Sequence, residues 1–220
     1  MGTAAYVQVL DLACGGLLLC AVLVLWRREL AVIIRVFAAQ GVILAVLVAV
    51  LAAHQHSPEL AVLALGLGVL RGGVLPWLLA RALTAAGPAR RETRPLVNVA
   101  ASLLAAAVLA LLSYAVSRPL VALIPSPATE AIPVGLTVVL IGFFVLVTRR
   151  RALSQLVGFL LMDNGITTVG FLTSANAGLV VELGVSLDVL LAVLVLRILT
   201  ARIQETFGDA DLDELRELHD

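Results

Sequence analysis

The stretch ALSQLVGFLLMDNGITTVGFLTS, residues 152–174, is long and apolar enough to cross a membrane, yet it carries a carboxylate near its middle. A transmembrane helix needs roughly 20 predominantly apolar residues to span the hydrocarbon core of a bilayer. A charge at the bilayer centre costs roughly 2.5–3.5 kcal/mol on insertion scales, so charged residues there usually face protein. The stretch therefore predicts a transmembrane helix whose Asp163 and Asn164 are turned toward other helices.

The rest of the chain has the same apolar character. Of its 220 residues, 61% are hydrophobic and only 14% are charged, which is far from the composition of a soluble globular domain. Apolar runs of spanning length, separated by Pro, Gly and Arg, predict an all-α polytopic membrane protein with seven transmembrane helices. We expect these helices at about residues 4–26, 30–53, 59–81, 96–117, 131–148, 152–174 and 177–201.

The loop arginines predict the orientation of the chain. Nearly all of them fall on one side of the predicted helices, and only Arg118 falls in a loop on the other. Because basic loops stay in the cytoplasm, we expect the N-terminus outside and the C-terminus inside a plasma membrane. The arginines on the cytoplasmic side are Arg27, Arg28, Arg81, Arg90, Arg91, Arg94, Arg149, Arg150, Arg151, Arg202 and Arg216.

Arg71 is the arginine placed deepest in the membrane, within LGLGVLRGGVLPWLL (residues 65–79). Gly68 and Gly72 have the small-xxx-small spacing that lets two helices approach closely. Pro76 cannot donate a hydrogen bond to the carbonyl of Gly72, so the backbone beside Arg71 is expected to bend. These features predict that Arg71 is buried against protein. Arg35, by contrast, lies near the cytoplasmic face and can extend its charge into water.

Four acids are also expected inside the membrane: Asp11, Asp163, Glu182 and Asp188. One interpretation is structural, with ion pairs such as Arg71 with Asp163 or Asp188 fixing the helix register. However, one deep arginine cannot pair with four acids. Burial disfavours the charged form of a carboxylic acid, so an acid without a counter-charge is expected to bind and release a proton, as in proton relays. Asn164 can then hydrogen-bond a carboxylate or a water molecule.

The remaining polar residues indicate neither an enzyme nor a metal site. Gln40, Asn98 and Ser102 are expected to form hydrogen bonds between helices. The sequence contains no phosphate-binding loop, haem motif, cysteine cluster or nucleophile–base pair. We therefore expect no catalytic residue, no metal and no cofactor in this chain.

Two stretches together resemble the hydrogenase-4 component E family. They are VGFLLMDNGITTVGFL (residues 157–172) and LVVELGVSLDVLLAVLVL (residues 179–196). Members of that family are membrane subunits of formate-hydrogenlyase-like and related group 4 hydrogenase complexes. Their last three helices are similar to the K subunit of NADH dehydrogenase and the C subunit of Mrp-type antiporters. The family motif Glu-Asn-Gly appears here with Asp163 as its acid. Glu182 and Asp188 match the family's Glu-Leu-Gly-Val-x-Leu-Asp element directly.

The resemblance implies a non-catalytic subunit of an ion-translocating redox complex of a prokaryotic membrane. It implies that Asp163 and Glu182 stand where the K subunit has its two membrane glutamates. Together with the buried charges, it leads us to expect a mid-membrane proton path through Asp163, Glu182, Asp188 and Arg71, with Asn164, Asp11 and Arg35 as supporting polar groups. The implied partners are antiporter-like membrane subunits, another helical membrane subunit and a peripheral redox arm, with no nucleic acid. A subunit of a cation/proton antiporter and a purely structural scaffold remain alternatives.

Three regions follow from these considerations. Residues 1–129 are expected to be an N-terminal four-helix membrane region, and residues 130–202 a three-helix module similar to the K subunit. Residues 203–220 are acidic, with leucines at helical spacing, and predict a cytoplasmic tail. This tail is either a short helix that binds a partner or a solvated segment.

Overall fold

The computed structural model describes residues 2–85, 97–123 and 125–173, and the regular structure in these ranges is helical. The predicted seventh helix (177–201), with Glu182 and Asp188, and the acidic tail lie outside the described residues. The elements are α1 (Thr3–Trp26), α2 (Leu30–Gln55), α3 (Pro58–Val69), the π-helical turn η1 (Leu70–Val74), α4 (Leu75–Ala85), α5 (Val99–Leu123), α6 (Pro127–Glu130), α7 (Ile132–Thr148) and α8 (Ala152–Thr173).

Six helical segments of the described chain are long and apolar enough to cross a membrane. Four of them correspond to α1, α2, α5 and α8. The segment Pro58–Thr84 combines α3, η1 and α4, and Pro127–Thr148 combines α6 with α7. The chain is therefore an all-helical polytopic membrane protein, and the first six expected helices are found close to their predicted bounds.

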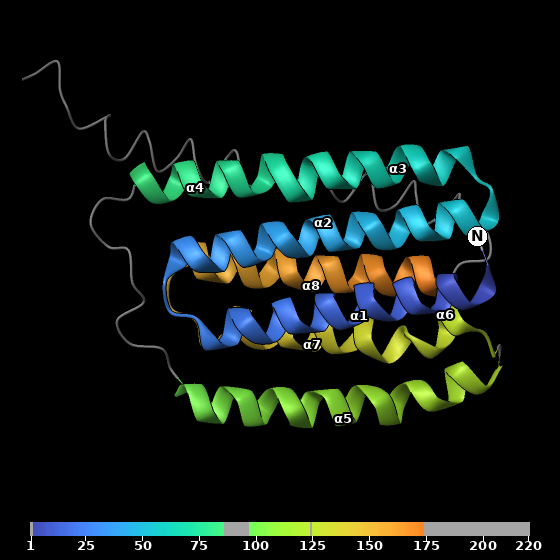
Figure 1. Ribbon diagram of the computed structural model, residues 1–220. Helices are drawn as coiled ribbons and strands as arrows, with labels where there is room; N and C mark the ends of the chain where they lie inside the picture. Colours follow the sequence, from blue (N-terminus) through green and yellow to red (C-terminus); the bar gives the residue numbers. More distant parts are fainter. Residues whose placement is uncertain (1, 86–96, 124, 174–220) are drawn as a thin grey trace, which may run out of the picture.

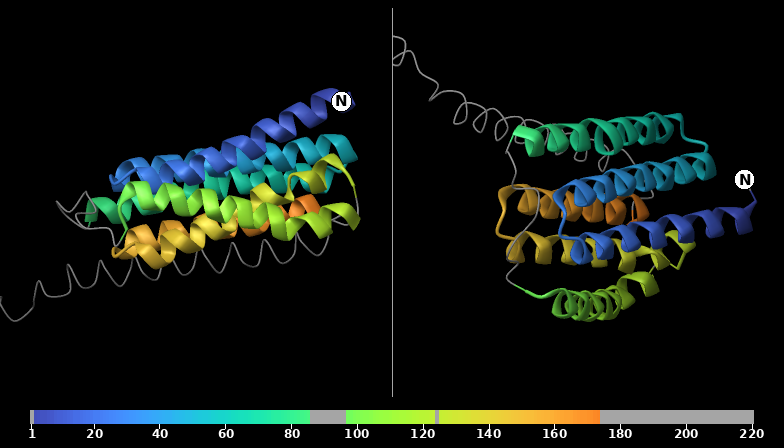
Figure 2. Two further views of the ribbon diagram at one scale, coloured as in Figure 1. Left: turned by 90° about the horizontal axis from the view of Figure 1, so that it is seen from below. Right: turned by 60° about the vertical axis from the view of Figure 1, so that its left-hand side comes forward.

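The helices lie side by side along one direction, with α2 in the interior (Figure 1). Helix α2 contacts α1, α8 and the rod formed by α3, η1 and α4. Helix α7 contacts α1, α5 and α8, so α5 lies at the opposite edge of the bundle from α3 and α4. The beginning of α1 extends past the neighbouring helices (Figure 2).

The connections at the N-terminal end of the bundle are short and capped. Helix α2 ends at His56, whose left-handed φ of 53° reverses the chain. Ser57 then accepts a hydrogen bond from the Leu60 amide, and Pro58 occupies the first turn of α3. At the start of α6, the side chains of Ser126 and Thr129 cap each other's backbone amides.

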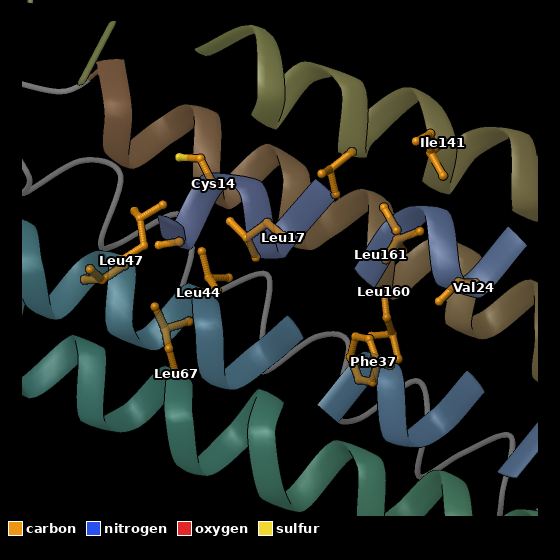
Figure 3. Packing of buried hydrophobic residues seen from close by; sticks show 14 of the residues in the cluster. Cys14, Leu17, Val24, Phe37, Leu44, Leu47, Leu67, Ile141, Leu160 and Leu161 are labelled. Carbon is orange, nitrogen blue, oxygen red and sulfur yellow. The ribbon is translucent and has the colours of Figure 1, made fainter. Parts of the chain in front are cut away.

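The core is built mostly from aliphatic side chains, with Phe37 among them, where the central helices meet (Figure 3). Leu17 of α1, Phe37 and Leu44 of α2 and Leu161 of α8 are completely buried. The large side chains on the outer surface are also mostly apolar, as expected for a helix bundle in lipid. Examples are Leu12, Leu65, Leu104 and Leu111.

Helices α7 and α8 touch through their backbones, because glycines recur seven residues apart on both. A Cβ added at Gly165 would lie 2.5 Å from the amide nitrogen of Val139, and one added at Gly158 would lie 2.7 Å from that of Leu146. Gly135 and Gly142 play the same role on α7. Such contact is typical of small residues at membrane helix interfaces. It brings the part of α8 that carries Asp163 firmly against α7.

Candidate functional site: a buried polar network across four helices

Arg71 lies in η1, where the helix changes its hydrogen-bonding pattern. The amide of Leu75 donates to the carbonyl of Leu70, five residues back, as in a π-helix. The next residue, Pro76, has no amide hydrogen, so the carbonyl of Gly72 loses its α-helical donor and the pattern is free to widen here. The helix beside Arg71 is therefore altered to a π-helical turn, in the place where a bend was expected.

Two glycines let η1 and α2 come together at Arg71. A Cβ added at Gly41 would lie 2.5 Å from the carbonyl carbon and oxygen of Arg71. One added at Gly72 would lie 2.8 Å from Cγ2 of Val42. At Gly41 the neighbouring atoms are backbone, which cannot move aside, so glycine is required there; at Gly72 a larger residue would only displace the side chain of Val42. The contact fixes Arg71 beside α2 and directs its long side chain toward α8.

The guanidinium of Arg71 binds two consecutive residues of α8. Its Nη2 forms an ion pair with Oδ2 of Asp163, and its Nη1 donates a hydrogen bond of 2.6 Å to Oδ1 of Asn164. Arg71 is 1% exposed, Asp163 2% and Asn164 1%. A buried charge is tolerated when it is paired and hydrogen-bonded, and this arrangement supplies both conditions.

The network continues from Asn164 to two further helices. Nδ2 of Asn164 donates to Oε1 of Gln40 at 2.9 Å, and Nε2 of Gln40 donates to the carbonyl of Leu17 at 3.1 Å. Thr168 donates back to the carbonyl of Asn164 at 2.7 Å. The chain of contacts thus joins η1, α8, α2 and α1. Because each amide both donates and accepts, the orientation of Asn164 is fixed from two sides.

The arrangement can hold opposite charges in an apolar interior, and it can respond to a proton. In the paired state Asp163 is the counter-charge of Arg71. A proton added to Asp163 would cancel that charge and leave Arg71 with the neutral Asn164 carbonyl. Arg71 would then lose the compensation that the Asp163 carboxylate gives it, which is costly in an apolar interior. Protonation of Asp163 therefore changes the electrostatic environment of Arg71.

Of the predicted polar residues, Arg71, Asp163 and Asn164 are brought together, whereas Asp11 and Arg35 are not. Both of the latter are exposed. Arg35 lies on the outer side of α2, as expected for a side chain that extends toward water. Asp11 lies on α1 and lines a separate cavity. It therefore lies within the span where it was expected, but apart from Arg71 and Asp163.

The lesser predictions had mixed outcomes. Gln40 forms hydrogen bonds between helices, as expected. Asn98 and Ser102 do not: Asn98 accepts from the Ala101 amide at the start of α5, and Ser102 bonds to the carbonyl of Asn98. That prediction is wrong, because the Asn98 side chain caps the first turn of α5, while the Ser102 hydroxyl donates to the carbonyl four residues back in the chain. Gly165, which follows Asn164, lies in an unbroken part of α8 and packs tightly against α7.

Arg149 was expected in a water-exposed loop, but it is 6% exposed. Its Nη2 donates to the carbonyls of Val24, Leu25 and Arg27 at 3.1–3.3 Å. The last carbonyls of a helix have no partner within it, so Arg149 caps the C-terminus of α1 from the end of α7.

Within the described ranges, no three His, Cys, Asp or Glu side chains gather as a metal site would require.

Two kinds of relatives match the sequence. The chain is 47% identical to the uncharacterized protein Rv0085 of Mycobacterium tuberculosis over 220 residues, the full length of both proteins. It is 31% identical over 131 residues to hydrogenase-4 component E of Escherichia coli (strain K12), and equally to that of Shigella flexneri. This match spans 60% of the chain and 61% of the hydrogenase component. No protein-family model and no solved structure matches the chain.

Proposed function

We propose a function from one premise: this chain belongs to the same protein family as Rv0085 of Mycobacterium tuberculosis. Its partial similarity to hydrogenase-4 component E, together with six apolar helices of spanning length, supports a membrane subunit of a respiratory-type complex. Such a subunit is an accessory rather than a catalytic component. The bacterial relatives fit a multi-pass protein of a prokaryotic plasma membrane.

The finer proposal is that the subunit contributes a proton path to an ion-translocating redox complex. The observation that carries it is the enclosed pair of Arg71 and Asp163, with Asn164 bonded to the same guanidinium. Ionisable residues inside a membrane are rare and mark proton or ion pathways. In the proposed path, Asp163, Glu182 and Asp188 bind and release protons, and Arg71 sets the charge against which Asp163 is protonated.

The coupling would work through the charge of Arg71. While Asp163 is ionised, the pair is neutral overall. When Asp163 takes up a proton, the positive charge of Arg71 stabilises the ionised form of a second carboxylic acid, which therefore releases its proton. Glu182 and Asp188 are the proposed second acids. Chemistry elsewhere in the complex would move protons by changing which acid compensates Arg71, and this chain would need no redox group for that task.

The assembly proposed around the chain follows the same similarity. It comprises antiporter-like membrane subunits, a second helical membrane subunit and a peripheral redox arm. Within it, the chain would have seven transmembrane helices, with its N-terminus outside and its C-terminus in the cytoplasm, as the arginine distribution favours. The proposed regions are residues 1–129, the module 130–202 and the acidic tail 203–220.

A second candidate is a scaffold whose buried charges only fix the packing of helices. The hydrogen bonds that run from Arg71 through Asn164 and Gln40 to Leu17 favour it, because such a network holds four helices in one arrangement. The two candidates differ in what the charges do after folding. A scaffold needs the pair only to assemble, whereas a proton path needs Asp163 in every turnover.

The experiment that tests the proposed assembly is affinity purification of the full chain from its own membrane in mild detergent, followed by mass spectrometry of the bound proteins. Co-purification of hydrogenase-like or quinone-reductase-like subunits together with antiporter-like ones is the expected result. Antiporter subunits alone would indicate a cation/proton antiporter instead. Recovery of the chain without any membrane subunit would contradict the proposal.

A further inference from the structure

A second polar feature lies apart from the buried network, at the end of the bundle where α1 begins. It is a cavity of about 640 Å³ between α1, α5, α6 and α7. This size lies within the range of about 300–1,000 Å³ that is usual for small-molecule pockets. The lining residues are Asp11, Cys14, Gly15, Tyr114, Arg118, Val121, Ala122, Glu130, Ala131, Pro133 and Val134.

The cavity brings together charges of both signs that do not neutralise one another. Asp11 comes from α1, Arg118 from α5 and Glu130 from α6. Among the described residues, none of these three side chains has an ion pair or a hydrogen bond. All three are exposed toward the cavity or its mouth. Charges at the edge of a membrane protein normally have a partner or contact lipid headgroups, and nothing in the described chain supplies one here.

The walls of the cavity combine this polar end with an apolar surface. Tyr114 and Arg118 lie four residues apart on the same face of α5, and Val121 continues that face. Tyrosine is enriched at membrane–water boundaries, where its ring contacts acyl chains and its hydroxyl contacts water. Beyond the cavity, much of the surface of α5 has no neighbour among the described residues. Leu111 and Leu120 of α5 are exposed there.

We propose that this cavity binds the headgroup of a zwitterionic phospholipid that carries a primary ammonium group, as in phosphatidylethanolamine. The guanidinium of Arg118 is suited to a phosphate diester, because its planar donors bind two phosphate oxygens at once. Asp11 and Glu130 are acceptors for an ammonium, which has three donors to share between them. The acyl chains would lie along the exposed apolar side of α5.

The charge pattern discriminates among lipids. An anionic headgroup such as phosphatidylglycerol offers a phosphate to Arg118 but no cation to Asp11 and Glu130, which would repel it. A choline headgroup has the cation but no N–H donors. The site therefore favours ethanolamine over both. This inference is independent of the proposed proton path and stands or falls separately from it.

The test titrates the purified full chain, in detergent micelles, with phosphatidylethanolamine, phosphatidylcholine and phosphatidylglycerol, and counts bound lipid by native mass spectrometry. We expect phosphatidylethanolamine to bind at least roughly tenfold more tightly than phosphatidylglycerol, the factor that one lost charged hydrogen bond produces. Arg118→Gln should weaken phosphatidylethanolamine binding by a similar factor. Arg28→Gln, which removes an exposed arginine at the other end of α1, should not change it.

Two further variants separate binding from misfolding. Asp11→Asn with Glu130→Gln removes the repulsion and should shift the preference toward phosphatidylglycerol, a gain that a damaged fold cannot produce. Gly15→Leu should obstruct the cavity, because a Cβ at Gly15 points into open space. Gly66→Leu is its control, since Gly66 on α3 is equally open but lies away from the cavity.

The source of the headgroup is settled by adding free glycerophosphoethanolamine. We expect it to compete poorly, because it lacks the acyl chains that contact α5. Equal binding by the free compound would overturn the lipid assignment in favour of a soluble zwitterion. Equal affinity for all three lipids, or an unchanged affinity in Arg118→Gln, would show that the cavity recognises no headgroup and is left for a protein partner.

Discussion

Arg71 and Asp163 form an ion pair in which both side chains are almost completely buried. The arginine comes from a π-helical turn and the acid from an α-helix that is packed backbone to backbone against its neighbour. One partner therefore sits on an irregular element and the other on a rigid one. Since breaking a buried pair leaves an uncompensated charge, substitutions at this pair have to be made in combination to be informative.

The first prediction separates a proton path from a scaffold. Asp163→Asn alone leaves Arg71 without its counter-charge, and we expect a loss of about 3–5 kcal/mol in the free energy of unfolding and a poor yield of assembled complex. Asp163→Asn combined with Arg71→Gln is neutral and should recover assembly. If Asp163 carries protons, the double variant assembles but moves protons far more slowly than wild type, as measured by a pH-sensitive dye in proteoliposomes.

The matching control is Asp163→Glu, which keeps the charge and lengthens the side chain by one methylene group. It should assemble and retain most proton movement. Wild-type proton movement in the double variant would contradict the proton path and leave the scaffold as the function of the pair.

The second prediction concerns the contact between α2 and η1. Gly41→Ala places a Cβ against the backbone of Arg71, so the two elements must separate. We expect destabilisation of about 1–3 kcal/mol, as for other overpacked sites, seen as a lower thermal unfolding midpoint in detergent. Gly73→Ala is the control within the same turn, because its Cβ meets nothing within 4 Å. It should be neutral or slightly stabilising, since alanine favours a helix over glycine by about 1 kcal/mol. Similar losses in both variants would refute the steric explanation.

The third prediction concerns the cap of α1. Arg149→Gln removes the charged donor from the carbonyls of Val24, Leu25 and Arg27. Hydrogen bonds from charged groups are worth about 1.5–3 kcal/mol, and we expect a loss of that order in chemical denaturation. Arg28→Gln, at an exposed position in the adjacent turn, should change stability by less than about 0.5 kcal/mol. Equal stability of the two variants would mean that the cap contributes nothing.

The fourth prediction concerns topology. In a chain whose Cys14 and Cys20 are replaced by alanine, a cysteine at Ser57 should react with a membrane-impermeant thiol reagent from outside the cell. A cysteine at Arg28 should react only after the membrane is opened. A reporter fused after Asp220 should be cytoplasmic, because seven spans put the two ends of the chain on opposite sides. A reporter on the same side as Ser57 would rule out the seventh span.

Much of the fold follows from the sequence because membrane spans are set by length and hydropathy alone. The burial of Arg71 was also predictable, from two glycines and a proline placed around a deep arginine. Its pairing with Asp163 was only one of two possibilities, because the choice depends on which helices are neighbours, and spacing along the chain does not contain that information.

The close contact at Gly41 was missed although a signal was present. Gly41 follows Gln40 in a mostly apolar helix, and a polar group beside a small residue is the composition of a close helix contact. Each of α7 and α8 also carries a pair of glycines seven residues apart, Gly135 with Gly142 and Gly158 with Gly165. The π-helical turn had only Pro76 as a signal, because a missing amide predicts a disturbed helix but not which pattern replaces it.

The distance along the chain between Arg71 and Asp163 has a consequence for biosynthesis. A ribosome delivers η1 to the membrane well before α8, so the arginine spends part of the synthesis without this counter-charge. At roughly 2.5–3.5 kcal/mol for an arginine at mid-bilayer, the unfinished chain is held in the membrane less firmly than the finished one. Products that stop before residue 163 keep that penalty. Completion of α8 therefore gives Arg71 its counter-charge, which a truncated product lacks. Membrane proteases can act upon this difference between intact and truncated chains.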